Sequence, residues 1–211
     1  MSAPTGSLPP VLVVMCRWPA FRRCKRRLGA SIGPAAAASV QTRLTAHTLA
    51  VCSELAGAGL VNLRIAMSGG RRHPQNAGPW ASFSDQGEGG LGLRMRRQLL
   101  KAHQSHPHHP LLMIGTDLPD LSRRDLCLAI QALQQHPLVL GPASDGGYWL
   151  LGLGPQLATT SPAWLFAGMP WGGDQVLKLT CALAQSRGVM PFLLAERNDI
   201  DRLEDLKPWL G

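Results

Sequence analysis

The sequence predicts a single α/β domain with a mostly parallel sheet, and two observations support this fold class. From Val11 onward, short apolar runs rich in β-branched residues alternate with segments whose apolar residues recur every three or four positions. The chain has 211 residues, of which 45% are hydrophobic, and no Pro-, Ser- or Gly-rich linker divides it. We therefore expect a flexible tail over residues 1–10 and one domain over residues 11–211.

The first half of the chain predicts strands and helices in alternation. Residues 11–14 form a β-branched run that fits a strand buried on both faces. A helix follows from Pro34, a residue suited to a first helical turn. Residues 61–67 alternate apolar and polar side chains, as a strand does, and residues 68–79 are expected to form a loop. A second helix follows the Gly-rich turn, with one apolar face formed by Leu91, Met95 and Leu99.

The second half continues the pattern. Residues 111–114 form a third apolar strand, and Ser122 with Asp125 resembles a capping box at the start of a helix. A further strand ends at Gly141. The remaining expected elements are strands at residues 148–153 and 189–194, a helix at residues 174–186 and a short helix from Leu203.

Charge is divided unequally along the chain. Residues 1–106 hold 14 of the 21 basic residues and 3 of the 13 acidic ones, and six cations lie within the eleven positions from Arg17 to Arg27. Such a block attracts phosphate, either of a nucleic acid or of a nucleotide diphosphate. Aspartates gather later, at residues 117–120 and 199–201. The two kinds of charge could meet on one nucleotide–metal ligand.

Several functional classes are excluded by what the sequence lacks. Five cysteines without a Cys-x-x-Cys pattern fit neither a disulfide framework nor a zinc ribbon. The apolar runs are too short for a membrane helix, and residues 1–10 do not resemble a signal peptide, so we expect a cytoplasmic protein without a membrane partner. The motifs of P-loop kinases, Rossmann dehydrogenases, zincins and α/β-hydrolases are absent.

Candidate functional residues follow the predicted strands, because ligands of open α/β sheets bind at the carboxyl ends of the strands. Lys25 and Arg27 could neutralise a nucleotide diphosphate; the alternative is a solvated basic surface. Asp117 directly follows a buried strand, and Pro119 keeps the residue before it extended, which favours a ligand for Mg²⁺ or Mn²⁺ over the alternative, a turn cap. Asp120 fits the turn-cap interpretation better.

Two further aspartates are candidate catalytic residues. Asp145 precedes Gly146 and Gly147 and could bind sugar hydroxyls or help to deprotonate an acceptor. The alternative is an Asp-Gly-Gly turn joining two strands. Asp201 shares one side of an extended segment with Asp199, and could be catalytic or could cap the helix near Leu203.

In order along the chain, these segments resemble a bacterial family of GT-A-type glycosyltransferases that is often labelled arsenosugar-biosynthesis glycosyltransferase. The matching residues are Arg17, Pro19, Lys25, Arg27 and Leu28; Gln86, Leu91, Gly92, Arg94 and Met95; Gly115 to Pro119; Gly141 to Tyr148; Trp171; and Asp199, Asp201, Asp205 and Leu206. The chain departs from the family pattern at Phe21, Arg22, Arg26 and Leu93.

The resemblance implies a three-layer α/β/α fold of the nucleotide-diphospho-sugar transferase type. It gives Asp117 the role of the metal-binding acid and implies that Gln86 and Arg94 join Lys25 and Arg27 in binding the nucleotide. The implied function is metal-assisted transfer of a sugar from a nucleotide-sugar donor to a small acceptor. Nucleotidyl transfer on the same fold is the first alternative. A basic nucleic-acid-binding module is the second, although it gives the aspartates no role. The sugar, the base, the acceptor and the oligomeric state stay open.

Overall fold

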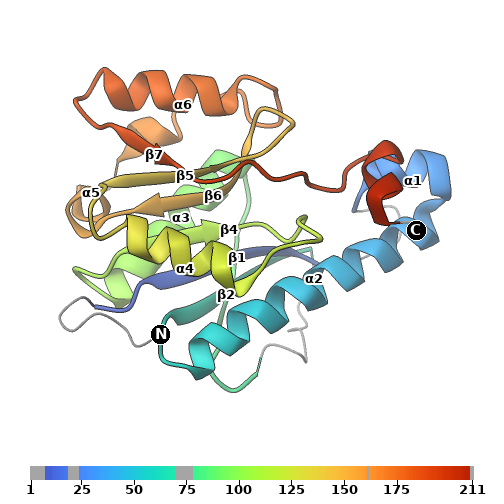
Figure 1. Ribbon diagram of the computed structural model, residues 1–211, viewed down its shortest axis with the longest axis horizontal. Helices are drawn as coiled ribbons and strands as arrows, with labels where there is room; N and C mark the ends of the chain where they lie inside the picture. The colour runs from blue at the N-terminus through green and yellow to red at the C-terminus, as the bar shows by residue number, and fades with distance from the viewer. Residues whose placement is uncertain (1–7, 19–23, 70–77, 161, 210–211) are drawn as a thin grey trace.

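The computed structural model describes residues 8–18, 24–69, 78–160 and 162–209, which form a central sheet between two layers of helices (Figure 1). The sheet has seven strands in the order β3-β2-β1-β4-β6-β5-β7. Only β6 runs antiparallel to its neighbours β4 and β5. The mostly parallel α/β fold expected from the sequence is therefore confirmed. In chain order the strands are β1 (Val11–Arg17), β2 (Asn62–Ser68), β3 (Ser82–Asp85), β4 (Leu111–Ile114), β5 (Leu138–Pro142), β6 (Tyr148–Leu153) and β7 (Pro191–Leu193).

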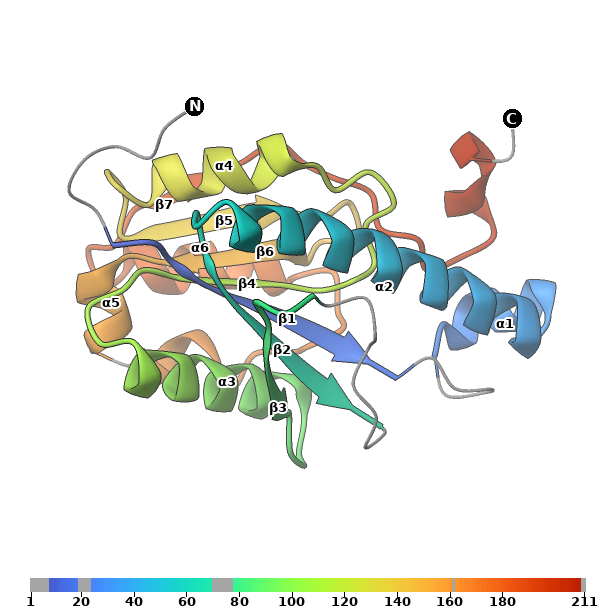
Figure 2. The same cartoon turned by 90° about the horizontal axis from the view of Figure 1, so that it is seen from below.

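The helices cover the two faces of the sheet, and the alternation of side chains along β1 supplies both cores. Leu12 and Val14 pack with helices α2 (Pro34–Gly57) and α4 (Arg123–Ala132). Val11 and Val13 lie on the other face, with α3 (Leu91–Ser105), α5 (Pro155–Thr159) and α6 (Val176–Gln185). Figure 2 shows α2 and α4 on one side of the sheet and α3 on the other. Among the described residues, no helix has the length and apolar character needed to cross a membrane.

The start of α4 is the capping box that the sequence predicts. The Ser122 hydroxyl accepts a hydrogen bond from the backbone N–H of Asp125, and the Asp125 carboxylate accepts one from the backbone N–H of Ser122. The same carboxylate also pairs with Arg197, which ties α4 to the segment that follows β7. Arg197 contacts Asp120 as well, at 3.2 Å.

Some elements escaped the sequence prediction. Strand β1 is longer than the run of residues 11–14 that the sequence predicts, since it continues to Arg17, and a short helix, α1 (Arg26–Ile32), begins inside the basic block. Strand β3 was missed because its four residues, Ser-Phe-Ser-Asp, contain no apolar run. Helix α5 and the 3₁₀ helix η2 (Ala163–Leu165) were also missed. The short helix expected from Leu203 is a 3₁₀ helix, η3 (Glu204–Trp209). The family departures at Phe21 and Arg22, most of the loop 68–79 and residues 1–7 of the expected tail lie outside the described residues.

A small third core, here called the satellite core, stands beside the carboxyl end of the sheet. It consists of Leu28, Ala37, Leu44 and Ile200, with Ile32, Val40 and Leu206 packed against them. Both ribbon views place α1, the start of α2 and η3 together at this end of the molecule (Figures 1 and 2). The packing brings segments from opposite ends of the sequence to the carboxyl end of β1 and β4.

Candidate active site

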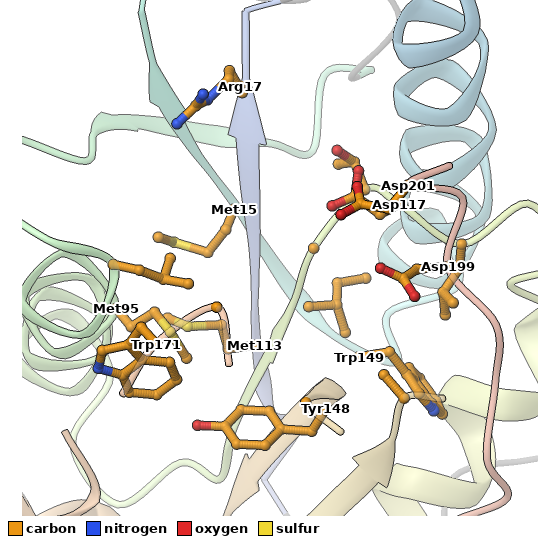
Figure 3. Close-up of a pocket in the computed structure, with 18 of the residues that line it drawn as sticks. Met15, Arg17, Met95, Met113, Asp117, Tyr148, Trp149, Trp171, Asp199 and Asp201 are labelled. Atoms are coloured by element: carbon orange, nitrogen blue, oxygen red, sulfur yellow. The ribbon is translucent and has the colours of Figure 1, made fainter. Parts of the chain in front are cut away.

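A cavity of about 440 Å³ opens at the carboxyl ends of β1 and β4, the position that open α/β sheets use for ligands. Its two sides differ in chemistry. Figure 3 shows Asp117, Asp199 and Asp201 gathered on one side and a group of methionine and aromatic side chains on the other. Lys25 and Asp145 also line the cavity.

Lys25 and Asp117 are in direct contact at the charged side. The Lys25 Nζ lies 2.6 Å from Oδ1 of Asp117 and 3.3 Å from Oδ1 of Asp201, and the lysine side chain is only 3% exposed. Burial by itself would lower the pKa of Lys25, but the two carboxylates outweigh it and raise the pKa above its ordinary value. The ammonium therefore stays charged between two acids that come from distant parts of the chain.

The backbone at Lys25 directs this side chain inward. Lys25 precedes α1 in the left-handed conformation, with φ 44° and ψ 51°, which is uncommon for a residue with a side chain. Leu28, three residues later, is buried in the satellite core. A strained non-glycine residue of this kind is typical of functional loops.

The segment around Asp201 is fastened by its neighbours. The backbone N–H of Ile200 donates to the carbonyl oxygen of Asp117, at 3.1 Å. The carboxylate that caps the following turn belongs to Asp205, which accepts from the N–H groups of Asp201 and Arg202. The side chain of Asp201 instead accepts from Lys25 and, at 3.4 Å, from the exposed Arg27. Capping, the alternative considered for Asp201, is thus done by another residue.

Asp145 and Asp199 both line the cavity, but their side chains differ in burial and in contacts. Oδ1 of Asp145 accepts a hydrogen bond from the backbone N–H of Gly147, so this exposed side chain holds the turn that the sequence offered as its alternative role. Asp199 is half-buried, and burial together with the charges of Asp145 and Asp201 raises its pKa to about 6. The sequence pattern paired Asp199 with Asp201 on one side of an extended segment but assigned Asp199 no separate role. The buried Ile200 between them agrees with that alternation.

Gln86 and Arg94 also line the cavity, and Gln86 is fully used within the fold. Its buried amide Nε2 donates to the carbonyl oxygens of Cys16 and Ala66, at 2.9 and 2.8 Å, which links the ends of β1 and β2. Its Oε1 accepts from Arg94 at 3.0 Å. Burial and the charges of Arg17 and Arg97 lower the pKa of Arg94. Gln86 therefore orients Arg94, and Arg94 faces the cavity.

The acidic residues of the cavity could bind a metal ion if a bound substrate supplied the remaining ligands. Within the parts of the chain that the structure describes, no three His, Cys, Asp or Glu side chains gather in a group that could hold a metal. Mg²⁺ commonly needs only one or two carboxylates when substrate phosphates supply the other oxygens. Asp117, whose side chain is 47% exposed to the cavity mouth, fits that pattern.

Three solved structures illustrate what the fold is similar to. A candidate nucleotide-diphospho-sugar transferase from Desulfovibrio desulfuricans G20 matches with a TM-score of 0.79 and 25% identity, over 95% of this chain and 85% of that one. The 2-C-methyl-D-erythritol 4-phosphate cytidylyltransferase from Thermus thermophilus matches with a TM-score of 0.55 and 19% identity, over 93% and 95%. Rv0371c from Mycobacterium tuberculosis H37Rv, in complex with manganese, matches with a TM-score of 0.51 and 14% identity, over 95% and 98%.

These likenesses confirm the nucleotide-diphospho-sugar transferase fold that the sequence motifs imply. The two matches below 25% identity support the fold alone. No curated protein matches the chain. The model of the family described as an uncharacterized protein conserved in bacteria (DUF2064) matches residues 48–173, which is more than half of the sequence, and the chain belongs to this family.

Proposed function

We propose that this protein is a cytoplasmic glycosyltransferase that moves a sugar from a nucleotide-diphosphate donor to a small acceptor, with the help of Mg²⁺ or Mn²⁺. The observation that carries the proposal is the contact of Lys25 with Asp117 and Asp201 inside the cavity at the strand ends. An ammonium beside a carboxylate is what a diphosphate with its metal ion requires, because one group binds the phosphates and the other binds the metal.

Asp117 would hold the ion jointly with the donor phosphates, and the ion would supply neutralisation of charge on the departing diphosphate. Lys25 and Arg27 bind the phosphate oxygens. In doing so they exchange their contacts with Asp117 and Asp201 for contacts with the ligand. Asp201, expected to be catalytic, acts in this proposal by positioning the two cations. Arg94, held by Gln86, offers a further positive charge at the edge of the cavity.

We assign the general base to Asp199 in preference to Asp145. Both residues line the cavity, but one carboxylate oxygen of Asp145 already accepts a hydrogen bond from the backbone N–H of Gly147 within its turn. The acceptor O–H gives its proton to the Asp199 carboxylate. The oxygen of the acceptor hydroxyl then bonds to the anomeric carbon of the sugar. At the same time the bond from that carbon to the diphosphate oxygen breaks, and the nucleoside diphosphate leaves. Asp145 is left to accept hydrogen bonds from sugar hydroxyls.

Thermal-shift screening of nucleotide-sugars, with and without Mn²⁺, tests the proposal because a ligand that binds the folded state raises the melting temperature. We expect a metal-dependent rise for at least one donor. The variant Asp117→Asn stays folded and loses the metal-dependent part of the rise. Its unliganded melting temperature falls, because Lys25 loses its nearer carboxylate, so each rise is measured against the unliganded value of the same protein. Glu204→Gln, an exposed acid-to-amide change outside the cavity, is the matched control. A rise that is equal in wild type and Asp117→Asn would overturn the role of Asp117.

Nucleotidyl transfer is the second candidate, favoured by the same cations and acid and by the cytidylyltransferase likeness in fold. This reaction releases pyrophosphate from a nucleoside triphosphate, whereas sugar transfer does not. Incubation with each triphosphate and a coupled pyrophosphate assay separates the two. Nucleic-acid binding draws less support, because Lys25 of the basic block is buried against two aspartates. Nucleic acid retained on filters at physiological salt would favour it instead.

A further inference from the structure

The apolar side of the cavity, here called the methionine chamber, is lined by Met15, Met95, Met113, Tyr148 and Trp171. Figure 3 shows these side chains grouped together, opposite the aspartates. Three thioethers from three different elements, β1, α3 and β4, meet two aromatic rings at this place. None of the residues assigned to the donor or to the metal belongs to this group.

The walls of the chamber are fixed by packing. Tyr148 meets Trp171 edge to face, with ring centroids 6.1 Å apart. Phe166 stacks nearly parallel to Trp171, with ring centroids 6.3 Å apart. Trp171 also lies against the backbone of Gly92, where an added Cβ would collide with the indole nitrogen. The glycine at the start of α3 is therefore required for the indole to take this position.

The chemistry of the lining selects what can enter. Apart from the Tyr148 hydroxyl and the Trp171 N–H, the named side chains offer thioethers and ring faces. These do not replace the hydrogen bonds that the several hydroxyls of a sugar or the polar edges of a nucleobase make with water, so burying such groups here is unfavourable. A flat apolar ring gains from burial and from contact with sulfur and aromatic faces. Methionine side chains also adapt their shape to a ring better than branched residues do.

We propose that the methionine chamber binds an aromatic ring of the acceptor, with the nucleophilic hydroxyl on that ring facing Asp199. This proposal rests on the proposed glycosyl transfer. It places the acceptor on the side of the cavity away from Lys25 and Asp117, which the donor diphosphate occupies. The acceptor class is then a phenol or another hydroxylated aromatic compound, and not a second sugar.

Titration of the protein with 2-naphthol in an isothermal titration calorimeter tests the chamber directly. We expect binding to wild type and a dissociation constant raised about tenfold or more in Trp171→Ala, because an aromatic wall is lost. Gly92→Ala, which displaces the indole without removing it, weakens binding as well. Trp80→Ala and Met190→Ala are matched controls, since these side chains are 62% and 65% exposed elsewhere, and both keep the wild-type affinity.

Competition with UDP, CDP and GDP, each with Mn²⁺, distinguishes an acceptor ring from the donor base. We expect the affinity for 2-naphthol to change by less than about twofold when a bound nucleoside diphosphate saturates the protein, since two independent sites do not compete. Displacement by any of these nucleotides would overturn the proposal, because the chamber would then hold the base. No binding of 2-naphthol, in a protein that Mn²⁺ and a nucleotide-sugar still stabilise, would overturn it too and leave the proposed function intact. Binding of 2-naphthol without any nucleotide binding would instead overturn the proposed transfer.

Discussion

Lys25 is the residue on which the proposed function depends most. Its ammonium is buried against Asp117 and Asp201, and its backbone adopts a conformation that few non-glycine residues adopt. The left-handed backbone costs free energy, whereas the two carboxylates more than offset the burial of the ammonium. A cation held in place in this way needs no reorganisation when a ligand phosphate takes over the interaction.

Replacement of Lys25 tests this role. Lys25→Met removes the charge and keeps most of the length of the side chain, so we expect sugar transfer to fall at least about 100-fold, as is typical when a charge-stabilising group is lost. Folding should survive, because Asp117 and Asp201 are partly exposed and can be hydrated. Lys178→Met, at an exposed lysine on α6, is the control for charge loss. Initial rates with equal activity in both variants would contradict the assignment.

Asp199 provides a pH-dependent prediction with a defined sign. Burial and two neighbouring acids raise its pKa above the ordinary value of 3.8, to about 6. Ionisation therefore destabilises the folded state, with no cost below pH 3.8 and the full cost above about pH 6. Asp199→Asn should raise the free energy of unfolding by about 1 kcal/mol at pH 7.5, a figure that allows for solvent screening, and leave it unchanged at about pH 3.5.

Urea unfolding of both proteins at these two pH values checks the stability effect. The activity should change in the opposite direction, because the amide cannot accept the acceptor proton, and general-base catalysis is typically worth about 100-fold or more. Wild-type activity should also fall as the pH drops through about 6. If Asp199→Asn is more stable at pH 7.5 and fully active, the raised pKa of Asp199 is supported and its assignment as the general base is refuted.

At the level of elements, helix α4 shows how a polar cluster joins two parts of the fold. Asp125 caps its own helix with Ser122 and pairs with Arg197 of the segment after β7. Burial would raise the pKa of Asp125, but the hydrogen bonds from Ser122 and Arg197 lower it below the ordinary value of 3.8. Its contribution to stability is therefore fully present at neutral pH and is lost as the pH falls through the lowered pKa.

Asp125→Ala should cost about 2 to 3 kcal/mol of unfolding free energy at pH 7, because it removes a capping box and leaves Arg197 without its buried partner. The cost should shrink in strongly acidic solution. Glu54→Ala, which breaks the exposed pair with Arg123, is the control and should cost less than about 0.5 kcal/mol. Denaturant midpoints of the two variants measure the difference. Equal losses would mean that the Asp125 cluster acts as an ordinary surface ion pair.

The elements that the sequence predicted well share a physical basis. Strand β4 and strand β6 have the expected bounds because their residues are apolar and end at clear turn signals. The helix beginning at Pro34 and the capping box at Ser122 follow from local chemistry. Strand β3 and helix α1 could not be found in the same way, because a polar edge strand and a short helix in a basic segment depend on tertiary contacts.

For the whole molecule, the sequence located the functional loops but not their contacts. It placed a cation after the first strand and an acid after β4, yet their direct pairing appears only in the folded structure. The methionine chamber was also invisible, because Met15, Met95 and Met113 each resemble an ordinary core residue in the sequence. The use of Gln86 as a link between strands appears only in three dimensions.

The satellite core should behave as a unit in hydrogen exchange, since it is small and separate from the two main cores. Ile200→Ala removes a buried side chain from it and should destabilise it by about 2 to 4 kcal/mol. We expect faster exchange in α1 and near residues 200–206, with unchanged exchange in β4. Leu193→Ala, at a side chain 48% exposed on β7, is the control and should change neither region. Uniform acceleration across the sheet would show that this core does not open separately.

The pairing of Lys25 with Asp201 joins positions 176 residues apart. During synthesis Asp117 is made well before Asp201, so a growing polypeptide that has paired β1 with β4 offers Lys25 only the first of its two carboxylates. A product whose translation stops before Asp201 would carry Lys25 with one of its two counterions missing. Maturation of the site is thus coupled to the late stages of protein synthesis.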